Sequence, residues 1–445
     1  MESKLNAKSP ITGEKIISRN KTLSKTYFNH DTLSNYVNTF SFPRLAGTEG
    51  EKNAVRLAYE TFEEIGFKKD QIEKQPFDFS DFYSTTLLKL LMTLNLIFNL
   101  NLLLLSYIHV SLTMLLIIFI SLVVYLIIKG SKHPEKSGFW GEYFGETISS
   151  TNVFTKIPAN KMPEKDAGNI VLSAHLDSKS QSITTFWRVV LYKIILYSVI
   201  LLGGDYIFFW IILLGNLNIS FYITMYVAWI SIILISSTNI CLLFLTTHNK
   251  SLGALDNASG MAIVFELSAF FIKHPLDNFN IWFCQFSAEE LGTMGSRVFV
   301  NKYENQFVKG RVFQINFDMV SCTCHKNNRI EYFKSYGVGI RRVIAPLLSK
   351  YILRAAKSEN LSVKGLHLST GAHTDTIPFR LRDYDAIDIT TGAASLYTHT
   401  VKDTPEKVDP KILLDTCNLF RETIKLIDDD YSILCENQDL KCDIE

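Results

Sequence analysis

Two long hydrophobic blocks constrain the fold of this chain more than any other feature. From Leu90 to Ile128 the chain runs for 39 residues without Asp, Glu, Lys or Arg. That is roughly twice the ~20 residues that a helix needs to cross a bilayer. We therefore expect two membrane-spanning helices with a tight turn near His109, rather than a buried hairpin in a soluble core.

The second block, Val189 to Leu245, admits two divisions. Spans at about Val190–Leu214 and Tyr222–Leu245 make one hairpin, whereas a break at Gly203-Gly204-Asp205 permits three shorter segments. Asp205 inside a span is costly unless it faces protein or lies near an interface. Hydropathy alone does not decide between two spans and three segments in this block.

The rest of the chain alternates between strand and helix patterns. Short apolar runs predict strands at Ile72–Phe79, Ser150–Phe154, Asn169–Ala174, Ile281–Phe286, Val312–Phe317 and Ile387–Ile389. Helical spacing follows Gly50 and recurs at Met261–Ile272, Ile340–Arg354 and Lys411–Ile427, with Pro346 marking a kink or the true start of the third. This alternation predicts an α/β sandwich.

These patterns suggest one soluble domain with two insertions. We assign residues 1–84, 130–185 and 248–430 to the soluble domain, and residues 85–129 and 186–247 to inserted transmembrane hairpins. Residues 431–445 are expected to form an acidic, disordered tail.

Charge and cysteine content narrow the class of protein. Lys and Arg number 45 against 44 Asp and Glu, so the chain has no basic field for nucleic acid. The seven cysteines are scattered and show no pairing framework, which favours free thiols and a reducing compartment. This includes Cys322-x-Cys324-His325, since no second pair lies nearby to complete a metal site. The N-terminus lacks the apolar core of a signal peptide.

Candidate metal ligands follow the predicted strands or lie beside glycine-containing turns, as does Asp256 in Gly253-Ala-Leu-Asp-Asn-Ala-Ser-Gly260. They are His175, Asp256, Glu290, Asp318 and His399. Two imidazoles and three carboxylates suit two divalent metals, most naturally zinc. The three carboxylates and one bridging hydroxide neutralise two dications, and paired metals can deprotonate a water held between them.

Two further acids have expected roles beside these ligands. Glu289 is the candidate general base, because it adjoins Glu290 and a hydrolytic site needs a group to move the proton of water. Asp177, two residues after His175, can hold the imidazole of that histidine. Each acid alone has an ordinary alternative, such as the acidic first turn of a helix for Glu289-Glu290. The positions taken together favour a metal site.

The order of the motifs resembles the M28 family of zinc aminopeptidases. The motifs are Ser173–Ser178, Gly253–Gly260, Ser287–Gly292, Phe317–Met319 and His399-Thr400 with Asp403-Thr404, and Pro43–Gly50 resembles the N-terminal segment of that family. The resemblance implies a three-layer sandwich around a mixed, mainly parallel sheet of the zinc-exopeptidase type.

Carried over by position, the resemblance implies two Zn²⁺ sites that share Asp256. One zinc would lie on His175, Asp256 and Asp318, and the other on Asp256, Glu290 and His399. Glu289 falls on the general base of the family and Asp177 on the acid that supports the first histidine. The expected function is a membrane-anchored dinuclear zinc aminopeptidase that hydrolyses the N-terminal bond of peptides.

Two alternatives remain. A glutaminyl-peptide cyclotransferase resembles the same motifs but uses one zinc, and a non-catalytic membrane scaffold or transport protein could carry a peptidase-like domain. Arg341-Arg342 could bind a substrate carboxylate, although a solvated helix face is favoured.

The chain departs from the family in the distance between His175 and Asp256, which the second hydrophobic block separates. An even number of crossings returns the chain to the same side, so two spans are favoured over three. Basic residues flank the spans on the catalytic side, namely Lys129, Lys132, Lys136, Arg188 and Lys193. The positive-inside rule therefore predicts an integral membrane protein whose peptidase domain faces the cytoplasm.

Overall fold

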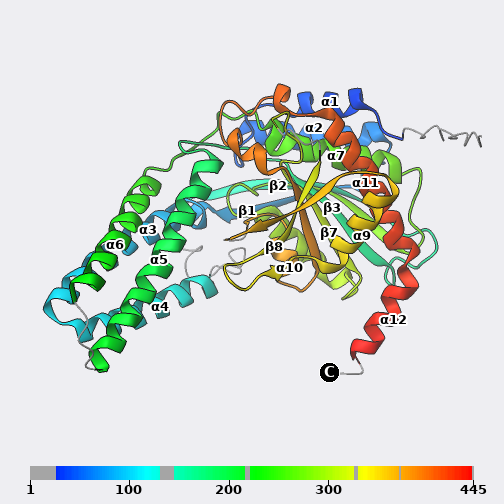
Figure 1. Ribbon diagram of the computed structural model, residues 1–445. Helices are drawn as coiled ribbons and strands as arrows, with labels where there is room; N and C mark the ends of the chain where they lie inside the picture. The colour runs from blue at the N-terminus through cyan, green and yellow to red at the C-terminus, as the bar shows by residue number, and fades with distance from the viewer. Residues whose placement is uncertain (1–26, 131–144, 216–220, 325–328, 370–371, 443–445) are drawn as a thin grey trace, which may run out of the picture.

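The computed structural model describes residues 27–130, 145–215, 221–324, 329–369 and 372–442 (Figure 1). Within them a mixed sheet has the strand order β1-β2-β6-β3-β7-β11-β8-β10, and β9 pairs with β8. The strands are β1 (Ile72–Ser80), β2 (Thr147–Ile157), β3 (Gly168–His175), β6 (Phe279–Phe286), β7 (Val312–Phe317), β8 (Ile330–Tyr336), β9 (Arg342–Val343), β10 (Val363–Leu368) and β11 (Asp385–Thr390).

The centre of the sheet is parallel. β3 pairs in parallel with β6 and β7, and β7 pairs in parallel with β11, whereas β1–β2, β2–β6 and β11–β8 are antiparallel. Every residue of β3, β6 and β7 is buried. A parallel sheet covered on both faces needs apolar side chains on both sides of each strand. This explains the uninterrupted apolar runs in the sequence.

Helices cover both faces of the sheet and complete the expected three-layer α/β sandwich (Figure 1). On one face α7 (Ser259–Phe271) lies against the central strands. The helices α1 (His30–Thr39), α2 (Glu49–Ile65), α9 (Pro346–Ser358) and α11 (Pro410–Asp429) share its core. On the other face α8 (Met294–Tyr303) packs Phe299 against Trp282 of β6, beside the short α10 (Ile377–Arg380).

The structure corrects two expectations near the C-terminal half of the chain. The helix expected from Ile340 begins only at Pro346, since proline is well suited to the first turn of a helix, and Arg342 lies in β9 instead. The acidic tail is helical over α12 (Tyr431–Cys442), where Tyr431 packs on Phe279 of the sheet.

Each hydrophobic block forms two helices. The first contains α3 (Thr86–Ile108) and α4 (Val110–Gly130), and the second contains α5 (Thr185–Leu214) and α6 (Phe221–Leu243). Gly203-Gly204-Asp205 lies inside a continuous α5, so the three-segment division is wrong. By length and composition, the helices at Asp81–Ile108, Thr185–Leu214 and Tyr222–Leu243 could each cross a membrane, and the apolar helix at Ser111–Ile127 is shorter.

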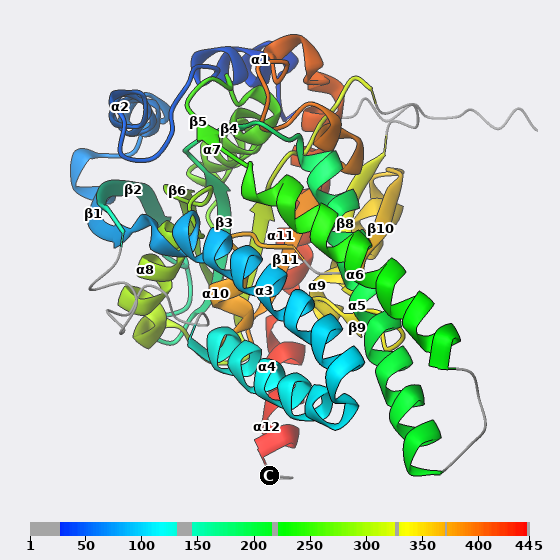
Figure 2. The ribbon, with the colours of Figure 1, turned by 90° about the vertical axis from the view of Figure 1, so that its left-hand side faces the viewer.

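The four helices pack on one another and project from one side of the sandwich (Figures 1 and 2). Polar contacts lie between them: the Ser106 and Tyr206 hydroxyls are 2.6 Å apart, and Trp229 donates to the Tyr107 hydroxyl. Large apolar side chains such as Leu104 and Tyr226 face outward. An outer surface of this kind suits lipid better than water.

A short antiparallel ribbon joins the two ends of the α5–α6 insertion. In it β4 (Ser180–Gln181) pairs with β5 (Thr247–His248), so the chain leaves and re-enters the sandwich at neighbouring points. The insertion therefore extends a loop of the α/β domain without separating the segments on either side of it.

Candidate metal centre

The candidate ligands gather at one edge of the parallel strands. His175 is the last residue of β3, Asp318 directly follows β7, and Glu290 follows the end of β6. Because the carboxyl ends of parallel strands meet at the same edge, these three side chains converge. Asp256 comes from the loop before α7, and His399 comes from a loop near the start of α5.

The ligand atoms form two groups that share Asp256. Nε2 of His175 lies 2.9 Å from Oδ1 of Asp256 and 3.5 Å from Oδ1 of Asp318. Nε2 of His399 lies 3.0 Å from Oδ2 of Asp256 and 3.0 Å from Oε1 of Glu290. Within each group, one ligand atom from each residue lies within 4.8 Å of the others.

Three of these atoms are buried and have no hydrogen-bond partner among the residues that the structure describes: Nε2 of His175, Oε1 of Glu290 and Oδ1 of Asp318. Buried polar atoms of native proteins rarely lack partners, so atoms that converge in this way need another ligand. Imidazole nitrogen and carboxylate oxygen are donors that zinc binds readily. The residues present therefore fit a divalent metal in each group.

Burial and the facing charges set the protonation of the metal-free site. Burial opposes ionisation of the Asp256 carboxyl, but the imidazoles of His175 and His399 outweigh it and hold its pKa well below the usual range. Burial raises the pKa of Asp318 to about 6 despite the nearby His175. Both imidazoles thus stabilise the charged form of the Asp256 carboxyl.

Adjacent Glu289 and Glu290 have opposite shifts. Burial, reinforced by the charges of Glu290 and Asp318, raises the pKa of Glu289 well above its usual range. For Glu290, His399 and Lys179 overcome burial and lower the pKa to about 2, with Lys179 Nζ only 2.8 Å from Oε2. Neighbouring carboxyls with separated pKa values are a common arrangement of an acid–base residue beside a permanently charged one.

The side chain of Asp177 was expected to hold the imidazole of His175, but its main contacts are different. Its carboxylate oxygen is 3.7 Å from Nδ1 of His175, whereas its backbone carbonyl is 3.0 Å from the same nitrogen. The carboxylate instead accepts hydrogen bonds from the backbone N–H groups of Glu289 and Glu290, at 3.1 and 3.2 Å. Asp177 therefore positions the glutamate turn with its side chain and the imidazole with its main chain.

The sequence interpretation gave no role to Arg44, which is fully buried beside the site. Its guanidinium donates to the carbonyl oxygens of Leu176, Leu252 and Gly253, at 2.6, 2.8 and 2.9 Å. It thus joins the segment after His175 to the segment before Asp256. Gly253 has φ 62°, and a Cβ there would lie 2.6 Å from that of Ser178, so glycine permits this close approach. The sequence could have indicated a role for Arg44 in the site, because this residue belongs to the Pro43–Gly50 motif.

Asp403 also went without a role, although it belongs to a quoted motif. Its carboxylate accepts hydrogen bonds from the backbone N–H groups of Leu255 and Asp256, at 2.6 and 3.2 Å. Burial, with repulsion from Asp256, raises the pKa of Asp403 to about 7. This acid holds the backbone of the loop that carries Asp256.

Two residues next to the α5–α6 insertion contact the ring of His399. Oε1 of Gln181 lies 3.1 Å from Nδ1 of His399, and Nη2 of Arg188 lies 2.6 Å from the same atom. Gln181 belongs to β4 and Arg188 to the first turn of α5. The hydrophobic insertion is therefore in direct contact with a candidate ligand.

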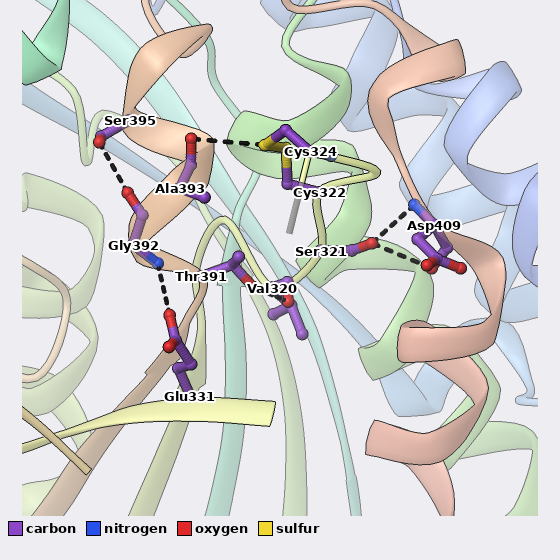
Figure 3. The surroundings of a disulfide bond; sticks show 10 residues. All are labelled: Val320, Ser321, Cys322, Cys324, Glu331, Thr391, Gly392, Ala393, Ser395 and Asp409. Atoms are coloured by element: carbon purple, nitrogen blue, oxygen red, sulfur yellow. Dashed lines mark hydrogen bonds between the residues drawn. A yellow bond between two sulfur atoms is a disulfide. The ribbon is translucent and has the colours of Figure 1, made fainter. Parts of the chain in front are cut away.

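A disulfide joins Cys322 to Cys324 in the segment that follows Asp318 (Figure 3). Ser321 donates to the carbonyl of Asp409, and the Thr391 hydroxyl donates to the carbonyl of Val320, so hydrogen bonds hold this segment on both sides. The expectation of free thiols at these two positions is wrong, because the chain brings them close enough to pair. His325 lies outside the described residues.

The fold and the two ligand groups define a class of protein, the zinc metallopeptidases. Residues 237–424 match the profile of Peptidase family M28. A curated relative, "Aminopeptidase YwaD" of Bacillus subtilis (strain 168), is 26% identical over 183 residues, or 39% of this chain and 38% of the relative. The chain is thus similar to peptidase family M28 over less than half of its length, and it spans well under half of that relative.

Solved structures show a similar fold. A glutaminyl cyclase of an Acidobacteriales bacterium is 16% identical, with a TM-score of 0.50 over 95% of this chain and 99% of its own. BSAP, a zinc aminopeptidase from Bacillus subtilis, is 14% identical, with a TM-score of 0.50 over 89% of this chain and 94% of its own. At these identities the likeness concerns the fold.

Proposed function

We propose that this protein is a membrane-anchored dinuclear zinc aminopeptidase. The observation that carries the proposal is the position of Asp256, whose two carboxylate oxygens face different imidazoles, His175 at 2.9 Å and His399 at 3.0 Å. In this proposal Asp256 would contribute to holding both zinc ions, together with His175 and Asp318 for one and with Glu290 and His399 for the other.

The two zinc ions, when bound, would supply Lewis acidity that activates water and polarises the peptide carbonyl. Glu289 is the residue that moves protons. It is buried beside Glu290, and its raised pKa lets it take a proton from water and then give that proton to the leaving amine. Asp177 fixes the backbone of this glutamate by accepting its N–H.

A cyclotransferase is the alternative reaction, since a glutaminyl cyclase shares the fold. Partnerless buried atoms in both groups favour the peptidase, because one zinc would leave either Oε1 of Glu290 or the pair Nε2 of His175 and Oδ1 of Asp318 without a ligand. Purified protein should bind two zinc ions per chain and release N-terminal residues from peptides, as read by mass spectrometry. One zinc per chain with pyroglutamate formation would identify the cyclotransferase.

A scaffold or transport protein would show neither activity. The decisive comparison is a peptide-library digest with and without added zinc, using the full chain in detergent. Shortening at the N-terminus that depends on zinc supports the aminopeptidase. Shortening at the C-terminus would make the enzyme a carboxypeptidase, and an unchanged library would favour the scaffold.

We also propose that α3–α6 cross the bilayer and that the peptidase domain faces the cytoplasm. Lys129 lies in the last turn of α4 and Lys193 is exposed in the third turn of α5, which fits the positive-inside rule. Lys132 and Lys136, on which the expectation also rested, lie outside the described residues. The Cys322–Cys324 disulfide favours the opposite orientation, since disulfides persist mainly in oxidising compartments.

A further inference from the structure

Arg188 is a half-buried cation without a carboxylate partner among the described residues. Its Nη2 contacts only the Thr185 hydroxyl, at 3.2 Å, and Nδ1 of His399, at 2.6 Å. Its Nε is buried and has no hydrogen-bond partner in the described chain. A guanidinium that is partly withdrawn from water is stabilised by an anionic partner. The described residues supply none, so the guanidinium is available to bind an anion from outside them.

The contact with His399 does not satisfy Arg188 in a metal-loaded site. A neutral imidazole that binds a metal through Nε2 carries its hydrogen on Nδ1 and must donate it, and Oε1 of Gln181 is there to accept it at 3.1 Å. Arginine can only donate. Hence the guanidinium cannot keep a hydrogen bond to Nδ1 when His399 acts as a ligand.

We propose that Arg188 binds the α-carboxylate of the substrate, so that the enzyme prefers dipeptides with a free C-terminus. This inference rests on the proposed peptidase function. A guanidinium pairs with a carboxylate through two parallel hydrogen bonds, and the N-terminal end of α5 adds a favourable dipole.

The position of Arg188 sets the length of the substrate. Only the ring of His399 separates it from the carboxylates of Asp256 and Glu290, where the scissile bond is bound. An α-carboxylate so close to the scissile bond must belong to the substrate residue directly after that bond, so the substrate is a dipeptide. Lys179 is not an alternative anchor, because it is already paired with Glu290 at 2.8 Å. Arg188 is thus a specificity-determining residue contributed by a hydrophobic helix.

A structural role for Arg188, as a tie between α5 and His399, makes a different prediction. Loss of such a tie would lower activity on every substrate equally. Loss of a carboxylate anchor lowers activity only on substrates that carry the carboxylate. Leu-Leu and Leu-Leu amide are a matched pair, since they differ only in this group.

The test uses the full chain, loaded with zinc in nanodiscs, and compares kcat/KM for these two substrates. A charge-assisted hydrogen bond contributes about 1.5–3 kcal/mol, so wild type should prefer the acid by about 10- to 100-fold. Arg188→Met should abolish the preference by raising KM for the acid, and Arg188→Lys should keep part of it. Lys193→Met, which removes an exposed cation from the same helix, should leave it unchanged.

Binding without turnover gives a second readout. Calorimetry on the Glu289→Gln background should show tighter binding of Leu-Leu than of its amide, and Arg188→Met should remove the difference while zinc content stays constant. Equal hydrolysis of acid and amide by wild type would overturn the inference while leaving the peptidase function intact. If neither substrate is hydrolysed, the peptidase proposal fails, and equal calorimetric affinities would then overturn the carboxylate site as well.

Discussion

Nε2 of His175 lies 2.9 Å from Oδ1 of Asp256, although all of α5 and α6 separates these residues in the chain. The β4–β5 ribbon closes the insertion at its base, and Arg44 bonds the backbone on both sides of it. A long insertion between ends that are held together adds little to the entropy of closing a loop. The candidate metal centre can therefore be built across a hydrophobic hairpin.

Replacing the candidate general base should separate catalysis from metal binding. Glu289→Gln keeps the size of the side chain and removes its ability to accept a proton. We expect kcat on peptides to fall by about 10²- to 10⁴-fold, with zinc content unchanged by atomic absorption. Glu164→Gln, at an exposed ion pair with Lys156, is the matched control and should retain full activity. If Glu289→Gln retains activity, Glu289 is not the general base.

Asp403 is expected to support metal binding through the backbone of Asp256. Asp403→Asn replaces one of the two carboxylate oxygens that accept from the Leu255 and Asp256 N–H groups with an amide nitrogen, which cannot accept. Substitutions of such supporting residues typically weaken metal affinity by about 10- to 100-fold, which a zinc competition titration would measure. Asp409→Asn changes a carboxylate that accepts from Lys411 N–H at the start of α11, and should leave zinc affinity unaltered. Equal zinc affinities of the wild type and Asp403→Asn would contradict this role.

Asp385 should make stability depend on pH in a defined direction. Burial raises the pKa of this carboxyl to about 6, against about 3.9 in an unfolded chain. The folded state therefore binds the proton more tightly, and the wild type gains stability as the pH falls from above 6 towards 4.

Asp385→Asn cannot make that gain and should be more stable than wild type at pH 7 by about 1–2 kcal/mol. The difference in Tm between the two proteins should shrink as the pH approaches 4. A difference for Asp385→Asn that is independent of pH would contradict the assignment.

The Cys322–Cys324 disulfide closes a very short loop, so its loss should cost only about 1–2 kcal/mol on the chain-entropy model. Cys322→Ala/Cys324→Ala should lower Tm by a few degrees and leave the fold intact. Mass spectrometry after alkylation of the denatured protein should detect these two thiols only when a reductant is added, whereas Cys241 reacts without one. Alkylation of all three without reductant would show that the bond is absent.

The orientation in the membrane can be read from glycosylation. Asn360-Leu361-Ser362 is an acceptor sequence, and Asn360 is exposed after α9 on the peptidase domain. With this domain in the cytoplasm, Asn360 should stay unmodified when the chain is translated with microsomes. A glycosylation tag inserted at residues 216–220, between α5 and α6, should then be modified. An endoglycosidase-sensitive shift that Asn360→Gln removes would place the domain in the lumen.

Much of this architecture could be predicted because its causes are local in sequence. The block around Leu100 lacks charges and the block around Ile200 has few, over lengths that suit pairs of long helices. The strands β3, β6 and β7 have the apolar runs of strands that are buried on both faces. The ligand candidates were recognisable because they follow such strands. The helical tail at Tyr431 was missed, since its main support is a distant contact with Phe279.

The sequence by itself determined the α/β pattern, the paired hydrophobic helices and the residue types able to bind metal, because periodicity and composition act over a few neighbouring residues. Only the tertiary structure decided that Asp256 faces two imidazoles, that Asp177 holds the glutamate turn, and that Arg188 lies against His399. These contacts join loops from different strands. Their geometry depends on how the sheet brings its carboxyl ends together, which no local pattern records.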